Sequence, residues 1–244
     1  MNNPPAEESL DPADWEALRR LAHQAIDDGF DYLQHVRERP VWQPVPDRVV
    51  ARLREPAPRL PQGAEFAYRE FKEIVMPYSM GNTHPRFWSW FMGNGTPFAA
   101  VGDFLAAVLN PNMGGGNHVP NHVEAQVVDW CKEIAGFPAE ASGLLVSGGS
   151  MANFVGLAVA RNSRAGVDVR AQGVAAIPRP LITYASVEVH SCNQKGVELL
   201  GLGTQALRKI PVNDDFTINL DLLKATIETD RVSGFRPICI IGSA

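Results

Sequence analysis

The chain contains few cysteines, and they lie far apart. Cys131, Cys192 and Cys239 are the only three in 244 residues, and no two of them form a CxxC pair. An odd and sparse set argues against a disulfide framework and favours a reducing compartment. Residues 1–8 are polar and acidic, without the positive and apolar regions of a secretion signal. We therefore expect a cytoplasmic protein.

Long apolar runs and an excess of positive charge are also missing. No apolar run in the sequence approaches the roughly 18 residues that a membrane-spanning helix requires, so no membrane partner is predicted. The net charge is −5, and the cluster of Arg161, Arg164 and Arg170 is short and typical of a solvated face. The composition gives no reason to expect a nucleic-acid partner.

The sequence also lacks convincing motifs for binding nucleotides or metal ions. There is no GxxxxGK[ST] loop, and residues 201–206 match the dinucleotide fingerprint only by letters, because they follow an expected helix and precede an expected strand. His118 and His122 are four residues apart, but Pro120 lies between them and no HExxH glutamate accompanies them. We predict no metal site.

A long amphipathic helix is expected near the N-terminus, after a loose tail at residues 1–10. Asp11 and Pro12 have the form of a helix start, a capping residue followed by proline, and apolar residues then recur at three- and four-residue steps from Trp15 to Val36. Six prolines within residues 39–61 predict a segment that wraps over a surface rather than a core element.

From there on helices and strands alternate. Helices are expected over residues 64–76, 98–109 (buried), 121–135, 151–160 (buried), 187–200 and 220–231, and strands over residues 181–184, 207–212 and 237–241. Unbroken apolar strands separated by helices are typical of a parallel sheet covered on both faces. The pattern therefore predicts an α/β fold.

One short segment has the composition of an anion site. Ser147, Gly148, Gly149 and Ser150 follow an apolar run and enter an expected helix. Small residues let the backbone approach a ligand, and the first-turn N–H groups of a helix carry a partial positive charge. Together they can form a cradle for an anion, with the Ser150 hydroxyl as a further donor. Taken alone, the tetrapeptide is more often an ordinary capped turn.

His190 lies where the expected strand over residues 181–184 gives way to a helix. This is the carboxyl end of a parallel strand, where ligands of open α/β sheets collect. A lone histidine is more often a structural residue, so its position alone leaves both interpretations open.

Several separated motifs resemble one enzyme family. They are His-Pro-Arg-Phe at residues 84–87, Val-Glu-Ala-Gln-Val-Val-Asp-Trp at 123–130, Ser-Gly-Gly-Ser-Met-Ala-Asn at 147–153, Tyr-Ala-Ser-Val-Glu-Val-His-Ser at 184–191, and Ile-Pro-Val at 210–212 ahead of Leu-Asp-Leu-Leu at 220–223. In this order and spacing they are similar to the group II pyridoxal-dependent decarboxylases, which include aromatic-L-amino-acid, histidine, tyrosine and glutamate decarboxylases. The resemblance runs from about residue 65 to the end.

The resemblance implies the fold of the pyridoxal-phosphate (PLP)-dependent transferases, the aspartate aminotransferase-like type I fold. Residues 1–90 would form an N-terminal helical and proline-rich wrapping segment, and residues 91–244 the first part of the PLP-binding large domain. We expect the chain to be an N-terminal half. The aspartate and the lysine with which relatives bind the cofactor would then lie beyond Ala244, and the chain alone would not decarboxylate.

The resemblance also assigns site residues. Gly149 and Ser150 match the contacts to the phosphate of pyridoxal 5′-phosphate, and His190 matches the catalytic histidine that stacks on the pyridine ring.

Phe87, Trp88 and Ser89 match positions that line the substrate pocket. Arg86 and Trp88 stand where the aromatic enzymes carry tyrosine and proline, and the His-Pro-Arg-Phe form is closer to glutamate decarboxylases, so the substrate class stays open.

The implied reaction is the PLP-dependent decarboxylation of an L-amino acid to an amine and carbon dioxide, in a homodimer. Two alternatives remain open from the sequence. One is another reaction on the same fold, such as that of a lyase or an aminotransferase. The other is a non-catalytic chain that dimerises or binds a partner through its N-terminal helix.

Overall fold

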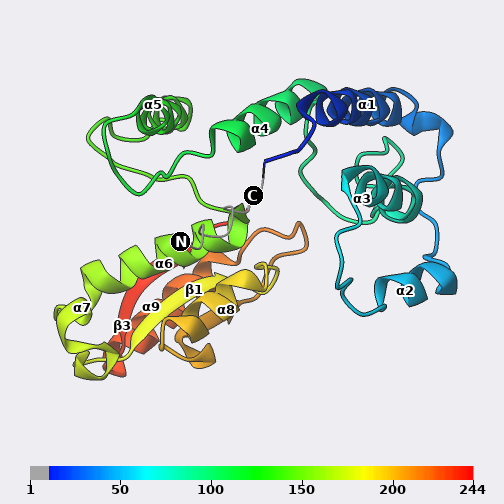
Figure 1. The fold of residues 1–244 in the computed structure, drawn as a ribbon. Coiled ribbons are helices and arrows are strands. Elements are labelled where there is room, and N and C mark those ends of the chain that lie inside the picture. The colour runs from blue at the N-terminus through cyan, green and yellow to red at the C-terminus, as the bar shows by residue number, and fades with distance from the viewer. Residues whose placement is uncertain (1–10, 244) are drawn as a thin grey trace. The chain divides into compact units, whose positions relative to one another are not determined.

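The computed structural model describes residues 11–243, which form two compact units, with the division along the chain between Asn112 and Met113 (Figure 1). The tail expected at residues 1–10 lies outside the described residues. The domain boundary expected after residue 90 stays a prediction, because the two units are defined by compactness alone and not by a bound cofactor. Among residues 11–243, no helix is both long and apolar enough to cross a membrane.

The first unit is helical. Its elements are α1 (Trp15–Gln34), the 3-10 turn η1 (Val36–Glu38), α2 (Asp47–Leu53), α3 (Ala64–Glu70), the π-helical η2 (Phe71–Val75), the 3-10 turn η3 (Met76–Tyr78) and α4 (Pro97–Leu109). Helix α1 begins at Trp15 because the Asp14 carboxylate accepts the N–H groups of Glu16 and Ala17 at 2.9 and 3.0 Å. The predicted start at Asp11 was therefore wrong by three residues: the cap is the aspartate directly before the first apolar residue of the helix.

The proline-rich segment is more ordered than expected. It was predicted to wrap over a surface rather than form a core element, and this was wrong at α2, whose Val49 is 1% exposed. The Arg52 guanidinium donates from Nε to Glu70 Oε2 at 2.8 Å and thereby joins α2 to α3. Prolines flank α2, and Pro46 occupies its N-cap, where a residue without an N–H loses no helical hydrogen bond.

Two helices predicted to be buried are present but largely exposed. On α4, Phe98 is 84% and Val108 65% exposed. The later helix α6 (Gly148–Arg164) buries Leu157 but leaves Met151 44% and Val159 62% exposed. Apolar composition reports what surroundings a helix would favour, and it does not report whether another element of the same unit covers it.

The second unit contains a three-stranded parallel sheet in the order β2-β1-β3. Its elements are α5 (Val119–Ile134), α6, α7 (Val169–Gln172), η4 (Val174–Ala176), β1 (Leu181–Ser186), α8 (Cys192–Leu199), η5 (Thr204–Ala206), β2 (Leu207–Ile210), α9 (Leu220–Val232) and β3 (Arg236–Ile241). Thr183 pairs with Leu207 on one side, and Leu181 pairs with Arg236 on the other. The predicted parallel α/β arrangement is confirmed, although α8 begins five residues later than expected.

Helices cover both faces of this sheet, as predicted. On one face Leu157 of α6 and Val197 of α8 pack with Ala185 of β1. On the other face Leu223 of α9 packs with Ile182 and Tyr184. Because neighbouring residues of a strand point to opposite faces, every residue of β1 is buried. Each fully buried aliphatic side chain stabilises the unit by about 1.5–3 kcal/mol relative to exposure.

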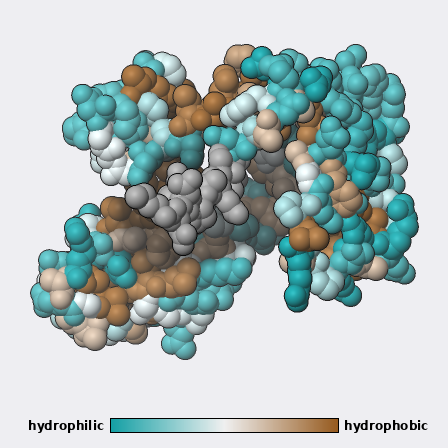
Figure 2. Space-filling view, viewed as in Figure 1, coloured by the Kyte–Doolittle hydropathy of each residue, from teal (hydrophilic) through white to brown (hydrophobic). Residues whose placement is uncertain are grey.

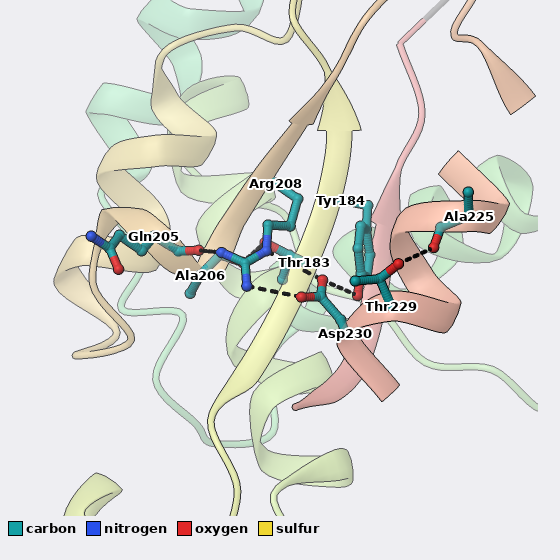
Figure 3. Close-up of polar contacts among 8 residues, drawn as sticks. All are labelled: Thr183, Tyr184, Gln205, Ala206, Arg208, Ala225, Thr229 and Asp230. Carbon is teal, nitrogen blue, oxygen red and sulfur yellow. Dashed lines mark hydrogen bonds and ion pairs between the residues drawn. The ribbon is translucent and has the colours of Figure 1, made fainter. Parts of the chain in front are cut away.

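A polar network joins the sheet to α9 within this core (Figure 3). Tyr184 of β1 donates its hydroxyl proton to Asp230 Oδ2 at 2.8 Å, and Arg208 of β2 donates from Nη2 to Asp230 Oδ1 at 2.9 Å. The hydrogen bond from Arg208 holds the pKa of the Asp230 carboxyl below its usual value. Burial, followed by the bond to Asp230, raises the pKa of Tyr184. Strand and helix are thus held together by an ionised carboxylate and a protonated phenol.

The raised pKa of Tyr184 predicts alkaline destabilisation of the second unit. Above the ordinary tyrosine pKa of 10.0, the unfolded chain loses this proton while the folded chain keeps it. The unfolded state then binds fewer protons, so the free energy of unfolding falls as pH rises, by up to about 1.4 kcal/mol per pH unit for this one group. In Tyr184→Phe this component disappears. Urea unfolding between pH 9 and 11 (about one unit either side of that pKa) measures it, and identical slopes in both proteins would contradict the expectation.

Candidate functional site

The N-terminus of α6 is open to an anion. Ser147 is the N-cap residue but makes no side-chain capping hydrogen bond, so the first-turn N–H groups receive no cap from it. Gly148 has a φ of +80°, a left-handed conformation that glycine adopts without strain. A Cβ added to Gly149 would meet no atom within 4 Å, which shows free space directly before Ser150. The helix therefore begins with uncapped donors beside open space, the arrangement expected of an anion cradle.

A pocket of about 380 Å³ lies between the N-terminal part of α6 and the length of α8. It is lined by Ser150, Met151, Phe154, His190, Ser191, Cys192, Lys195, Gly196 and Leu199. The structure therefore brings together Ser150 and His190, two of the predicted cofactor-contacting residues that lie 40 positions apart, and Gly149 directly precedes Ser150. Their roles toward a cofactor stay predictions.

His190 is held by its own turn. The backbone N–H of Cys192 donates to His190 Nδ1 at 3.2 Å, and the His190 carbonyl accepts the N–H of Asn193 at 3.1 Å. Because Nδ1 acts as an acceptor, the neutral ring carries its proton on Nε2. The imidazole thus has a defined orientation and one N–H available for a ligand.

The sequence reasoning missed several lining residues of this pocket. Cys192, Lys195, Gly196 and Leu199 repeat at three- and four-residue steps on α8 and therefore share one helix face. That spacing was visible in the sequence. The side of α8 that faces α6 was not, because it depends on how the two helices pack on the sheet.

Phe87, Trp88 and Ser89 belong to the first unit, so their part in a substrate pocket stays a prediction. The rings of Phe87 and Trp90 meet edge to face with centroids 5.8 Å apart, while Trp88 is 89% exposed. His84 at the start of this segment is 4% exposed.

No residue cluster in the described part of the chain favours a metal ion. Within residues 11–243 there is no group of three histidine, cysteine, aspartate or glutamate side chains in a position to share one. His118 instead places Nε2 3.2 Å from the carbonyl oxygen of Gly115.

Comparison with known families identifies the chain. The family described as "Pyridoxal-dependent decarboxylase conserved domain" matches residues 46–244. The chain belongs to this pyridoxal-dependent decarboxylase family. The resemblance inferred from the separated motifs is confirmed.

Curated relatives in this family carry decarboxylase and related names. An aromatic-L-amino-acid decarboxylase from Bacillus atrophaeus is 28% identical over 94% of this chain and 46% of that protein. A tyrosine decarboxylase from Oryza sativa subsp. japonica is 27% identical over 97% of this chain and 46% of that protein. A phenylacetaldehyde synthase from Petunia hybrida is 26% identical over 96% of this chain and 47% of that protein. The chain spans about half the length of the curated relatives it matches.

Solved structures show the same fold. Oryza sativa TDC, crystallised with PLP and tryptamine, superposes with a TM-score of 0.80 at 23% identity, over 95% of this chain and 52% of that one. Mouse CSAD superposes with a TM-score of 0.80 at 22% identity, over 93% of this chain and 48% of that one. The predicted fold class is confirmed by these superpositions.

The pocket fits a pyridoxal phosphate group in its chemistry. The uncapped turn at Gly149 and Ser150 offers N–H and hydroxyl donors for a phosphate, and His190 offers a flat ring with a defined orientation. Met151 and Phe154 supply apolar surface beside them, as expected of a site for an aromatic cofactor.

Proposed function

We propose that this chain carries part of the active site of a pyridoxal 5′-phosphate-dependent enzyme that decarboxylates an L-amino acid to an amine and carbon dioxide. The observation that carries the proposal is the single pocket that unites Ser150, at the uncapped start of α6, with His190, after the end of β1. The family of the chain is consistent with it.

In this proposal Gly149 and Ser150 hold the phosphate, and His190 covers the ring. When bound, the cofactor supplies an electron sink for the bond to the substrate carboxylate. The chain supplies orientation. The Cys192 N–H donates to His190 Nδ1 and fixes the orientation of the ring, so that Nε2 is the ring nitrogen left to contact a ligand or to exchange a proton with the product.

Phe87, Trp88 and Ser89 are proposed to contact the substrate side chain. The curated relatives named for aromatic amino acids favour an aromatic substrate. The exposed Trp88 supports this, since its ring is free to stack on another aromatic group. The His-Pro-Arg-Phe segment instead favours L-glutamate as the substrate, because this form is closer to glutamate decarboxylases.

A second candidate reaction is the oxidative conversion of an aromatic amino acid to an aldehyde, in which dioxygen and water are consumed and carbon dioxide, ammonia and hydrogen peroxide are released. A relative named phenylacetaldehyde synthase matches 96% of this chain, so the resemblance alone does not separate the two reactions. Product analysis does: an amine identifies the decarboxylase, and an aldehyde identifies the second candidate.

We further propose a cytoplasmic homodimer. The three cysteines are free, which is consistent with a reducing compartment. The apolar side chains that α4 exposes, including Phe98 and Leu109 at 84% and 73%, support association with a second subunit.

The proposed role of His190 is testable in the protein that contains this chain. Replacing His190 by alanine removes the ring that orients the cofactor and substrate, and we expect kcat for amine formation to fall about a hundredfold. His23→Ala, an exposed histidine on α1, is the control and should keep normal kcat. Near-normal turnover of His190→Ala would remove the proposed role, and absence of carbon dioxide and amine with the unaltered protein would overturn the proposed reaction.

A further inference from the structure

Lys195 is the one charged residue among those that line the pocket between α6 and α8. It lies in the second turn of α8, three residues after Cys192, on the helix face that also contributes Gly196 and Leu199. Ser150 and Met151 line the same pocket from the first turn of α6. A lysine ammonium on a flexible four-carbon stem is thus placed at the same cavity as the uncapped helix start.

The ammonium of Lys195 makes no ion pair and no side-chain hydrogen bond with other residues in the described part of the chain. Of the other four lysines, Lys224 also makes no such contact within the described residues, whereas the remaining three do. Lys72 and Lys132 each contact a carboxylate, and Lys209 contacts the Gln194 amide. No aspartate or glutamate lines the pocket, so nothing in it would neutralise a cation there.

The charge balance of the proposed phosphate site is incomplete without a cation. A phosphate monoester carries about −1.5 to −2 charges at neutral pH. The start of α6 contributes the equivalent of roughly +0.5, and the Ser150 hydroxyl contributes a neutral donor. Helices α6 and α8 pack closely, since a Cβ on Gly196, the residue after Lys195, would lie 2.9 Å from Leu157 Cδ1 of α6. Lys195 and Ser150 line the pocket that these two helices border.

We propose that Lys195 is a cofactor-binding residue whose ammonium pairs with the phosphate held by Gly149 and Ser150. This rests on the proposed function, and it adds a cation to a site otherwise formed by backbone N–H groups and a hydroxyl. A charge-assisted pair of this kind strengthens phosphate binding more than a neutral hydrogen bond does.

The test compares two probes that cannot form an imine, pyridoxine 5′-phosphate and pyridoxine, in equilibrium dialysis with the cofactor-free form of the protein that contains this chain. The difference in affinity between the two probes measures the contribution of the phosphate group to binding. Lys195→Met should weaken binding of pyridoxine 5′-phosphate about tenfold, because a hydrogen bond to a charged group is lost, and leave pyridoxine within about twofold. Lys195→Arg keeps the charge and should restore phosphate binding to within about threefold.

Lys224→Met is the matched control, since it removes one exposed lysine from α9, on the opposite face of the sheet, and changes net charge equally. It should leave both affinities unchanged. Since Lys195 is itself exposed, its variants should unfold at the wild-type temperature.

Two failures are distinguishable. If the wild-type protein prefers pyridoxine 5′-phosphate and Lys195→Met keeps that preference, the assignment of Lys195 is wrong. The proposed cofactor pocket is then not contradicted. If the wild-type protein shows no preference for the phosphorylated probe, the proposed phosphate site itself is wrong. An equal loss in Lys224→Met would show that net charge, and not a pair at the site, governs binding, which also overturns the assignment.

Discussion

Replacing Asp230 by alanine is expected to lower the free energy of unfolding of the second unit by about 3 kcal/mol. Its side chain is 8% exposed and accepts hydrogen bonds from both Tyr184 and Arg208. Alanine would leave the buried Tyr184 hydroxyl without its hydrogen-bond acceptor. It would also leave the Arg208 guanidinium, whose side chain is 28% exposed, without its carboxylate partner. The cost is the desolvation of partners that the folded chain can no longer satisfy.

The helix dipole has a smaller and opposite effect on the stability of Asp230→Ala. Asp230 lies in the last turn of α9, where a negative charge is unfavourable to the helix dipole, so its removal returns about 0.3–1 kcal/mol. The cost of leaving Tyr184 and Arg208 without their acceptor is therefore larger, and the free energy of unfolding falls in Asp230→Ala.

Glu228→Ala is the matched control for this prediction. Glu228 is on the same helix and pairs with Arg231, but both side chains are more than half exposed, so about 0.5 kcal/mol or less is expected. Urea unfolding at neutral pH measures both variants. Equal losses in Asp230→Ala and Glu228→Ala would show that the buried network contributes no more than a surface pair.

Replacing Gly81 by alanine is expected to destabilise the first unit by about 3 kcal/mol, from two sources. Gly81 has a φ of +84°, where a residue with a Cβ is strained by about 1–2 kcal/mol. The added Cβ would also overlap the carbonyl oxygen of Val41, and backbone atoms cannot rotate away as a side chain can. The proline-rich segment and the loop before His84 would have to separate.

Gly63→Ala separates these two sources. Gly63 has nearly the same φ, +82°, but a Cβ there meets nothing within 4 Å. It should therefore cost only the conformational strain, about 1–2 kcal/mol. Denaturant unfolding followed by circular dichroism gives both values. A Gly81→Ala loss no larger than that of Gly63→Ala would mean that the contact with Val41 relaxes freely.

Predictions from the sequence succeeded where a local pattern is enough. The strands predicted over residues 181–184, 207–212 and 237–241 are present as β1, β2 and β3. Only β1 is buried along its whole length, as expected of a strand covered on both faces. A helix after the glycine and serine residues was also predicted, over residues 151–160, but α6 begins three residues earlier, at Gly148, with Ser147 as its N-cap. The separated motifs identified the family because their order and spacing agree.

Other predictions failed where the answer depends on remote residues. Asp11 and Asp14 are both residues that can cap a helix, and the structure has Asp14 as the cap, accepting the N–H groups of Glu16 and Ala17. The apolar composition of α4 predicted burial, yet no element of its own unit covers Phe98. The buried carboxylate of Asp230 had no distinctive neighbours in the sequence, because its partners lie 46 and 22 residues away.

The sequence by itself determined that this protein is an α/β chain of the pyridoxal-dependent decarboxylase family, with small residues before one helix and a histidine after one strand. Tertiary structure alone decided that Ser150 and His190 share a pocket, and that Lys195 shares it with them. The physical reason is that backbone conformation follows from neighbouring residues, whereas a pocket forms where helices distant in the sequence pack on one face of a sheet.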